Sequence, residues 1–447
     1  MFKGECLEMS DTVKVATSIR DVLFSFANAF ANCGFIKRKR KVTGSNFLRS
    51  LLFAFMGNTS PSESGLARSA FAQELKISSQ GLNRRFTKEC AEFLKMILDK
   101  AMGEVVRSDK LLNFEVLSRF TNINICDSSL VGIPDALTNI WKGTGDKSNR
   151  DQAAAIKFDV SMEMKSGGIK MHLVQGVMAD NTTPSAIEYG EVGSLQLRDL
   201  GYYDLDRMKM QNQMGVYWIS RFKTGTNTFE VDGKFFDLLA YLKNLNKDGV
   251  HKIEKDVLVG NKQKIPCRIL IFKLNEKEIQ ERIRKKYRKA AVNGTVPSAE
   301  AIELCSWSIF ISNVPIEKLT LDECYAMYRV RWQIENIFKL WKDECKVDES
   351  KSKKKWRILC EIYVKLIGIL IRHWIVVIGQ WHLKNKSLTK GFQMIKEQSA
   401  RFAEAIKSID ALIALLEEFI EGFKYGCSQN SRKKKPNTYK MLDNLKQ

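Results

Sequence analysis

Residues 328–342 of this sequence, YRVRWQIENIFKLWK, hold the side chains with the most varied chemistry. On a helix that turns by about 100° per residue, four polar side chains fall within about 60° of one another: Tyr328, Arg331, Glu335 and Lys342. An adjoining apolar stripe is expected to face the core and consists of Val330, Ile334, Ile337 and Trp341. The polar face, bordered by Trp332, combines a carboxylate, two cations, a phenol and an indole. That set suits a metal ion, a phosphate backbone and an unstacked base.

Two aspartates are expected where apolar strands end. Asp127 follows residues 121–126 (TNINIC), and Asp199 follows residues 194–198 (SLQLR). Carboxylates at strand ends can converge with Glu335 if its helix covers the edge of the sheet. Three such oxygen ligands suit Mg²⁺ or Mn²⁺. Two of these ions about 4 Å apart promote phosphoryl transfer without a histidine.

Each acid alone also has an ordinary structural interpretation. An aspartate after a strand is more often a turn former or a helix cap. A glutamate beside cations on a helix is more often part of a surface ion pair. Three further aspartates compete for the middle position: Asp180, Asp204 and Asp206. Asp199 is preferred because it follows an apolar strand and precedes Gly201.

The elements that must position these residues alternate in type from Phe120 onward. The pattern predicts three strands, a helix, a strand, a helix and a strand, with a β-hairpin over residues 158–177. This order predicts an α/β fold in which helices pack on a mixed sheet. Residues 223–304 interrupt it as a β-rich insertion with a basic helix at 276–291, and residues 307–312 are expected to return to the sheet.

Helical patterns flank this central region on both sides. We therefore predict three domains: a helical DNA-binding domain at 1–115, a catalytic domain at 116–345, and a helical region at 346–447 that is a candidate for dimerisation. In the first domain, residues 64–98 resemble a helix-turn-helix with its second helix at 79–98. Four residues of that helix are of types that contact bases or phosphates: Gln80, Asn83, Arg84 and Arg85. Plain helix packing is the alternative, because such pairs occur in any helical domain.

The charge balance favours a polyanionic partner. The chain has 72 Lys and Arg against 51 Asp and Glu, a formal net charge of +21. That excess points to nucleic acid first and to an anionic membrane second. The basic run at 37–41 is interpreted as a solvated loop or a phosphate clamp, and the tail that carries the basic run at 432–435 is expected to be mobile. Charged residues interrupt the most apolar run, 356–383, which predicts a core or dimer-interface helix and no membrane span.

The cysteines and histidines argue against a zinc enzyme and against histidine-based catalysis. The ten cysteines lack the spacing of zinc sites, which predicts reduced, mostly buried thiols in a cytosol. The four histidines include no pair with metal-binding spacing, so histidine-based catalysis has little support. Residues 1–30 carry four acids and lack the layout of a signal peptide. A carboxylate-based enzyme fits this composition better.

The spacing Y-x2-R-x3-E-x6-K within residues 328–342 resembles the YREK signature of bacterial insertion-sequence transposases with an RNase H-like DDE domain. Residues 125–134 (ICDSSLVGIP) and 197–204 (LRDLGYYD) are similar to that family's two aspartate blocks. Residues 220–223 (SRFK) are similar to the block that follows the second aspartate. The resemblance covers about residues 120–345 and includes the insertion, although a Thr or Gly is common where Ser128 follows Asp127.

The resemblance implies a role for each matching residue. The catalytic ligands for Mg²⁺, which Mn²⁺ can replace, would be Asp127, Asp199 and Glu335. Contacts with DNA phosphates near the cleaved end would come from Tyr328, Arg331 and Lys342. Members that make hairpin ends stack an extruded base on tryptophans, which here would be Trp332 and Trp307, although Trp307 could instead pack in the core. Two further DNA-binding candidates in a matching block are Arg221 and Lys223, in addition to Arg84 and Arg85 of the helix-turn-helix pattern.

The resemblance also implies a reaction and its partners. A cut-and-paste transposase acts on double-stranded DNA, both at inverted-repeat ends and at a target, and would form a homodimer in the synaptic complex. Its place would be the bacterial cytoplasm, associated with the nucleoid. Two alternatives stay open: an RNase H-like DNA nuclease without strand transfer, and a non-catalytic DNA-binding protein derived from a transposase. Acids at all three motif positions argue against the second alternative.

Overall fold

The fold is seen in a computed structural model that describes residues 10–32, 34–37, 41–145, 153–430 and 438–445. The predicted basic run at 432–435, and residues 38–40 of the run at 37–41, lie outside these residues. The chain divides into two compact units. The first unit comprises Met1–Asn113, Ser128–Met178 and Gln333–Tyr439. The second unit comprises Phe114–Asp127, Ala179–Trp332 and Lys440–Gln447.

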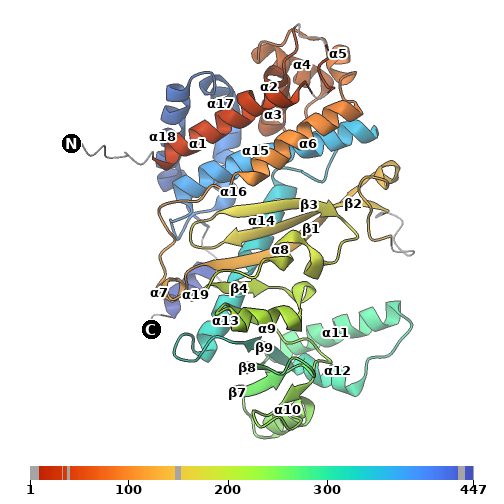
Figure 1. Ribbon diagram of the computed structural model, residues 1–447, viewed down its shortest axis with the longest axis vertical. Coiled ribbons are helices and arrows are strands. Elements are labelled where there is room, and N and C mark those ends of the chain that lie inside the picture. Colours follow the sequence, from red (N-terminus) through yellow and green to blue (C-terminus); the bar gives the residue numbers. More distant parts are fainter. Residues whose placement is uncertain (1–9, 33, 38–40, 146–152, 431–437, 446–447) are drawn as a thin grey trace, which may run out of the picture. The chain divides into compact units, whose positions relative to one another are not determined.

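Nine strands hydrogen-bond in the order β3-β2-β1-β4-β5-β9-β8-β7-β6 (Figure 1). Their bounds are β1 Ile123–Ile133, β2 Ala154–Glu163, β3 Ile169–Gln175, β4 Leu195–Arg198, β5 Tyr217–Arg221, β6 Thr228–Phe229, β7 Lys252–Val259, β8 Ile265–Lys273 and β9 Trp307–Ser312. β4 pairs in parallel with β1 and β5, whereas β9 runs antiparallel to β5 and β8. A mixed sheet with flanking helices confirms the predicted α/β fold class, consistent with an RNase H-like domain.

The predicted order of elements is confirmed. β1 is followed by the β2–β3 hairpin. The helix α8 (Pro184–Ile187) then precedes β4, and α9 (Leu205–Gln213) connects β4 to its parallel neighbour β5. The insertion adds β6 to β8 to the sheet beyond β9, with one helix between β6 and β7 and two helices between β8 and β9. These helices are α10 (Leu238–Lys247), α11 (Glu276–Val292) and α12 (Ala299–Glu303). The insertion therefore enlarges the sheet and carries the basic helix that the sequence predicts.

Strand β1 is longer than predicted, so the prediction that Asp127 ends a strand is wrong. β1 continues from Ile123 to Ile133, whereas its neighbour β4 stops at Arg198. The second half of β1 continues beside β2, the next strand of the sheet. Asp127 therefore lies just after the last β1–β4 pair, but β1 itself continues beyond it.

Two predicted helices are each divided in the structure. Residues 328–342 belong to α13 (Leu321–Val330) and α14 (Trp332–Asp343), because the backbone N–H of Arg331 bonds three residues back, to Tyr328. The single helix predicted at 79–98 is also wrong. α5 (Ser79–Asn83) ends early, and α6 (Lys88–Gly103) begins anew at an N-cap formed by Thr87.

The first unit is built around one long apolar helix, α15 (Lys355–Gln380) (Figure 1). By length and composition α15 could cross a membrane, but its most apolar window is entirely buried within the protein. Five helices that pack against it are α1 (Asp11–Arg20), α3 (Gly44–Gly57), α6, α16 (Leu388–Glu397) and α18 (Ile409–Gly426). Other helical segments of this unit are α2 (Ala27–Phe30), α4 (Glu63–Ala72) and α17 (Ser399–Ala405). The prediction of a core helix is confirmed, since 23 of its 26 residues are buried: 358–380.

The turn of the β2–β3 hairpin docks on the C-terminal half of α15. Trp381 Nε1 donates to the carbonyl of Met164 at 2.9 Å, and His373 Nε2 lies 2.9 Å from the carbonyl of Gly167. Gly167 has φ +76°, and a Cβ at this position would approach the Trp381 ring to 2.6 Å, so only glycine fits. Burial lowers the pKa of His373 to about 4, an effect that the bond to Gly167 opposes. His373 is therefore neutral at pH 7 and donates its Nε2–H to the turn.

His373 predicts how stability depends on pH. Its folded pKa is depressed, so its contribution is present above about pH 6.5 and is lost as the pH falls toward about 4. Lowering the pH from about 7 to about 5 should cost about 2 kcal/mol through this group. His373→Gln should remove that part of the loss, measured by urea unfolding at both pH values. His251→Gln, at an exposed position, is the control that should keep it.

Candidate active site

Asp127 and Asp199 occupy the same register position on neighbouring parallel strands. The β1–β4 ladder ends at the pair Cys126 and Arg198, and each aspartate is the next residue of its chain segment. Parallel strands lie about 4.8 Å apart, and side chains at one register position project from the same face of a sheet. The two carboxylates are therefore neighbours at one edge of the paired strands.

Arg331 places a cation on this aspartate pair. Its Nη1 donates to Asp127 Oδ2 at 2.9 Å, with side chains only 8% and 19% exposed. A charge-assisted bond shielded from water is stronger than an exposed ion pair. Arg331 directly follows α13, so the end of that helix is fixed to β1.

Tyr328 belongs to the same cluster. Its side chain is buried, and its ring packs on Phe310 of β9 with centroids 4.9 Å apart. Burial raises the pKa of Tyr328 to about 12; the charge of Asp199 adds to the rise, whereas Arg331 and Arg221 oppose it. Two cations and a carboxylate are therefore near enough to the phenol to affect its pKa. A phenol with that pKa is protonated at neutral pH and able to donate to an anion.

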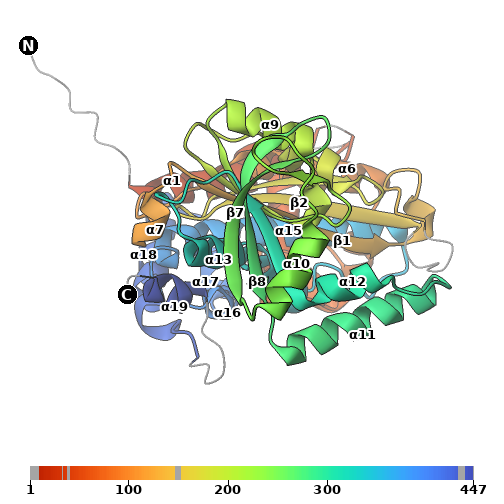
Figure 2. The same ribbon diagram turned by 90° about the horizontal axis from the view of Figure 1, so that it is seen from below.

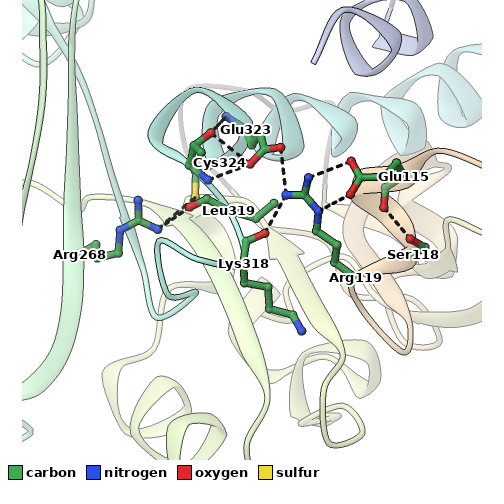
Figure 3. Close-up of polar contacts among 9 residues, drawn as sticks. Glu115, Ser118, Arg119, Arg268, Lys318, Leu319, Glu323 and Cys324 are labelled. Atoms are coloured by element: carbon green, nitrogen blue, oxygen red, sulfur yellow. Dashed lines mark hydrogen bonds and ion pairs between the residues drawn. The ribbon is translucent and has the colours of Figure 1, made fainter. Parts of the chain in front are cut away.

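The opposite end of α13 is fixed by Arg119 (Figure 3). Arg119 Nη1 lies 2.9 Å from Glu323 Oε1 and donates to the carbonyl of Lys318 at 2.9 Å, while its other nitrogens bond Glu115. Glu323 also completes a capping box with Thr320 at the start of α13. Burial would raise the pKa of Glu323, but hydrogen bonds from Arg119 and Thr320 outweigh burial and lower it. Glu323 is therefore a carboxylate at neutral pH.

A second buried arginine secures the loop that leads into α13 (Figure 3). Arg268, on β8, donates to the carbonyls of Val314 and Leu319 at 2.9 and 2.8 Å. Its remaining nitrogens pair with Glu254 on β7. The insertion strands thus satisfy backbone carbonyls of the 313–320 loop, which would otherwise be buried without donors.

The Arg119–Glu323 and Asp127–Arg331 ion pairs attach the two ends of α13 to the chain segment that contains the first half of β1. Glu323 and Arg331 lie about two helical turns apart, near the two ends of α13. Their partners, Arg119 and Asp127, lie just before β1 and at the end of its ladder with β4. Because a helix is stiff over two turns, these contacts fix where Tyr328 and Arg331 stand relative to the aspartates.

Glu335 and Lys342 lie on α14 and belong to the first unit. Glu335 is in the first turn of α14, and Lys342 Nζ donates to the carbonyl of Leu130 on β1 at 3.0 Å. The predicted apolar stripe is confirmed, since Val330, Ile334, Ile337 and Trp341 are all buried. Within the described ranges, no three His, Cys, Asp or Glu side chains gather as a metal site.

The aspartates that compete with Asp199 have structural tasks. Asp204 caps α9 by accepting from the backbone of Arg207 at 3.0 Å, and Asp206 accepts from Gln263 at 2.9 Å. Asp180 lies against Gly201, where a Cβ would come within 2.6 Å of its Oδ2. Of these four aspartates, only Asp199 directly follows the last residue of the β1–β4 pairing. Asp199 therefore stays the preferred candidate for the second catalytic acid.

The predicted stacking tryptophans differ in exposure. Trp332 is 54% exposed, whereas Trp307 is 2% exposed in the core of the second unit, with Lys273 Nζ 4.7 Å from its ring centroid. Trp332 is thus accessible to a ligand, and Trp307 has the packing role considered as its alternative. Both assignments to DNA remain predictions.

The other basic candidates lie in different places. Arg221 ends β5 beside Tyr328, and Lys223 lies over the ring of Tyr203 at 5.6 Å. Arg84 and Arg85 follow α5 in the connection to α6, so they do not lie on a long second helix as predicted. Their contact with DNA stays a prediction.

Two of the three predicted carboxylate ligands are arranged as a hard divalent cation requires. Asp127 and Asp199 supply carboxylates on adjacent strands, the arrangement in which two acids can share an ion. Glu335 adds a third carboxylate by sequence, and its role as a ligand remains a prediction. The bond between Asp127 and Arg331 shows that a positive charge is already accommodated at this carboxylate.

Sequence reasoning missed the residues that orient α13. Arg119, Arg268 and Glu323 carry no motif of their own, and their partners are distant in the chain. One local signal was present: Thr320-Leu-Asp-Glu323 has the spacing of a capping box and marks the start of the helix. The arginine partners could not have been found in this way.

Comparisons with known proteins show which sequences this chain resembles. A family model described as the transposase DDE domain matches residues 119–371. The transposase for insertion sequence element IS231B of Bacillus thuringiensis subsp. berliner is 30% identical over 356 residues, covering 76% of this chain and 74% of that protein. The IS231C transposase of the same subspecies is 27% identical over 398 residues, covering 84% and 82%. The IS1151 transposase of Clostridium perfringens is 26% identical over 365 residues, covering 76% of each.

A double-mutant cycle tests whether the Arg119–Glu323 pair holds α13. The pair is largely buried, with side chains 26% and 10% exposed, so Arg119→Gln and Glu323→Gln should show a coupling energy above about 1 kcal/mol in urea unfolding. The exposed pair Lys95–Asp99 is the control and should couple by no more than about 0.5 kcal/mol. Equal coupling in the two cycles would contradict the anchoring role.

Proposed function

The chain belongs to the transposase DDE domain family, and we propose that it is an insertion-sequence transposase that cuts element ends and joins them to target DNA. The observation that carries this proposal is the common register position of Asp127 and Asp199 within the matched region. Two carboxylates suit a divalent cation, and the neighbouring arginine and the net charge of +21 suit a polyanionic substrate.

Asp127, Asp199 and Glu335 would hold Mg²⁺ or Mn²⁺. When bound, two such ions activate an attacking oxygen and neutralise charge that develops on the leaving oxygen. The role of the three carboxylates would be to hold those ions next to the substrate's phosphorus. Asp127 depends on Arg331 for its orientation, because their 2.9 Å bond fixes one of its oxygens.

Tyr328, Arg331 and Lys342 would contact the phosphates next to the scissile bond. A guanidinium presents five N–H donors in a planar fork, so Arg331 is able to bond a phosphate while it remains on Asp127. Tyr328 would donate its phenolic proton, which burial retains because the pKa is about 12. These groups hold the DNA backbone in line for displacement at phosphorus.

We further propose that the chain follows the hairpin route of the YREK group. Water first cuts one strand at the element end and releases a 3′-OH. That hydroxyl attacks the opposite strand, which closes a hairpin on the element end and releases the flanking DNA. A second water opens the hairpin, and the 3′-OH then attacks target DNA. Each step forms one P–O bond and breaks another, so one site serves all four.

Trp332 would support the hairpin step. A tight DNA hairpin forces a base out of the stack, and an aromatic ring compensates for that loss by about 1–3 kcal/mol. The 54% exposure of Trp332 makes its indole accessible for this contact. Bringing two ends together requires two active sites, so a homodimer in the bacterial cytoplasm is part of the proposal.

Substitution of the acids tests the site. Asp127→Asn, Asp199→Asn and Glu335→Gln should each reduce Mg²⁺-dependent cleavage of an element-end duplex to background, because each removes a carboxylate ligand. End binding, measured by gel shift in EDTA, should stay largely intact. The surface variant Glu300→Gln, on α12, is the control that should cleave normally. Cleavage retained by Glu335→Gln would remove it from the site.

Product analysis separates the proposed activity from its alternatives. A transposase joins the 3′ end of the element to target DNA, whereas a nuclease leaves only cut ends. A protein that binds DNA without metal-dependent cleavage would contradict both enzyme assignments.

Trp332→Ala tests the hairpin route. The variant should form hairpin ends at least about tenfold more slowly while the first nick is nearly unchanged, because only the hairpin needs a displaced base. Single-turnover gels of the two products measure the two rates. The control is Trp356→Ala, a change at a tryptophan on α15. Equal slowing of both steps by Trp332→Ala would indicate a structural role.

A further inference from the structure

The C-terminal half of α11 is the most concentrated run of positive charge in the second unit. Residues 282–289 read RIRKKYRK, with six cations and no acid. A surface that serves solubility usually mixes both signs of charge. On a helix, like charges four residues apart repel, as at Arg284 and Arg288 or at Lys285 and Lys289. This composition weakens the isolated helix and therefore points to a polyanionic partner.

Beyond Arg282 and Ile283, which are half-buried, the rest of this segment faces solvent. Residues 284–289 are six consecutive exposed residues, which span more than one and a half helical turns. Tyr287 is 51% exposed among them. None of the five cations in this segment forms an ion pair with a described residue of the chain: Arg284, Lys285, Lys286, Arg288 and Lys289. Figures 1 and 2 show α11 along the outside of its unit, beside α12.

The strand directions place the base of α11 at the same edge of the sheet as the aspartates. β5 runs parallel to β4 and ends at Arg221, and β9 runs antiparallel to it, with Arg221 opposite Phe310. The start of β9, Trp307, therefore lies at the edge where β4 ends and Asp199 follows. Arg282 of α11 donates to the carbonyl of Trp307 at 2.7 Å and to Ser308 Oγ at 2.9 Å.

A series of arginines connects the surroundings of the aspartates with α11. Arg331 bonds Asp127, and Arg221 lies beside the same Tyr328 that Arg331 contacts. Arg221 is also close to Arg282: burial lowers the pKa of Arg282, and the charge of Arg221 lowers it further. From Arg282 the exposed cations of α11 extend the series away from the carboxylates.

We propose that residues 282–289 of α11 bind the phosphate backbone of duplex DNA that leads away from the cleaved bond. The proposal rests on the proposed function, since it takes duplex DNA as the substrate at the carboxylates. The contact is independent of base sequence, because Lys and Arg on an exposed helix reach phosphates without fixing a register on base edges. Residues 282–289 span about 12 Å of the helix axis, and long Lys and Arg side chains extend that reach to neighbouring phosphates.

The test is the salt dependence of DNA binding by the full chain with Lys285→Gln and Lys286→Gln combined. The probe is a fluorescent random-sequence duplex, in EDTA, titrated from about 50 to about 200 mM KCl. The slope of log Kobs against log[salt] should become shallower by about 2, because each lost phosphate contact removes about 0.9. A second variant, Arg284→Gln with Arg288→Gln, should give the same change.

The matched control removes two lysines from the neighbouring helix α10. Lys243 and Lys247 are exposed, and Lys243→Gln with Lys247→Gln changes the net charge equally. The control should keep the wild-type slope. A slope that is unchanged in both α11 variants on this duplex and also on a duplex carrying the element end, or an equal change in the control, would overturn the proposal.

A second arm identifies the DNA that uses this surface. The same measurement is made on a duplex that carries the inverted repeat found beside the gene. A change on both duplexes assigns α11 to flanking or target DNA, and a change on the repeat duplex alone assigns it to the element end. If the wild-type chain binds neither duplex, the proposed function fails. If wild type binds and the α11 variants match it, only this inference fails.

Discussion

The ion pair between Asp127 and Arg331 is the contact on which the geometry of the carboxylate cluster depends. It joins a strand near the beginning of the matched domain to a helix end 204 residues later in the chain. Both side chains are shielded from water, so either one left alone would be a costly buried charge. The interaction therefore requires β1 and α13 to be placed together, and it fixes the cation of the signature beside the first acid.

The rest of the second unit makes that placement possible. The Arg119–Glu323 pair holds the other end of α13, and Arg268 satisfies the carbonyls of the loop before it. Arg268 comes from the insertion, whose strands extend the sheet beyond β9. The insertion consequently has a structural task near the site in addition to carrying the basic helix α11. Buried arginines that bond backbone carbonyls and carboxylates together make this arrangement rigid.

The first unit is organised around the burial of a very apolar helix, α15. α15 is apolar enough to enter a membrane, and helices from both the beginning and the end of the chain cover it. His373 and Trp381 on and after this helix also fix the β2–β3 turn. The stability of the hairpin is therefore linked to the core helix, and through the neutral state of His373 it is linked to pH.

The sequence by itself determined the properties that depend on near neighbours. Period-2 and period-3.6 patterns gave the order of strands and helices, the apolar stripe that ends at Trp341, and the basic character of α11. The YREK spacing and the charge of +21 indicated a phosphate-handling family. These signals are local, because side-chain periodicity and motif spacing are read within one or two elements.

Only the tertiary structure decided which distant residues meet. It showed that β1 continues past Asp127, that Arg331 interrupts the predicted helix, and that Arg119 and Arg268 orient α13. Sequence patterns could not supply these facts, because strand ends depend on where the neighbouring strand stops and ion pairs depend on which segments fold together. The pairing of Asp127 with Arg331 is set by the sheet register and the path of α13, and no local pattern encodes either.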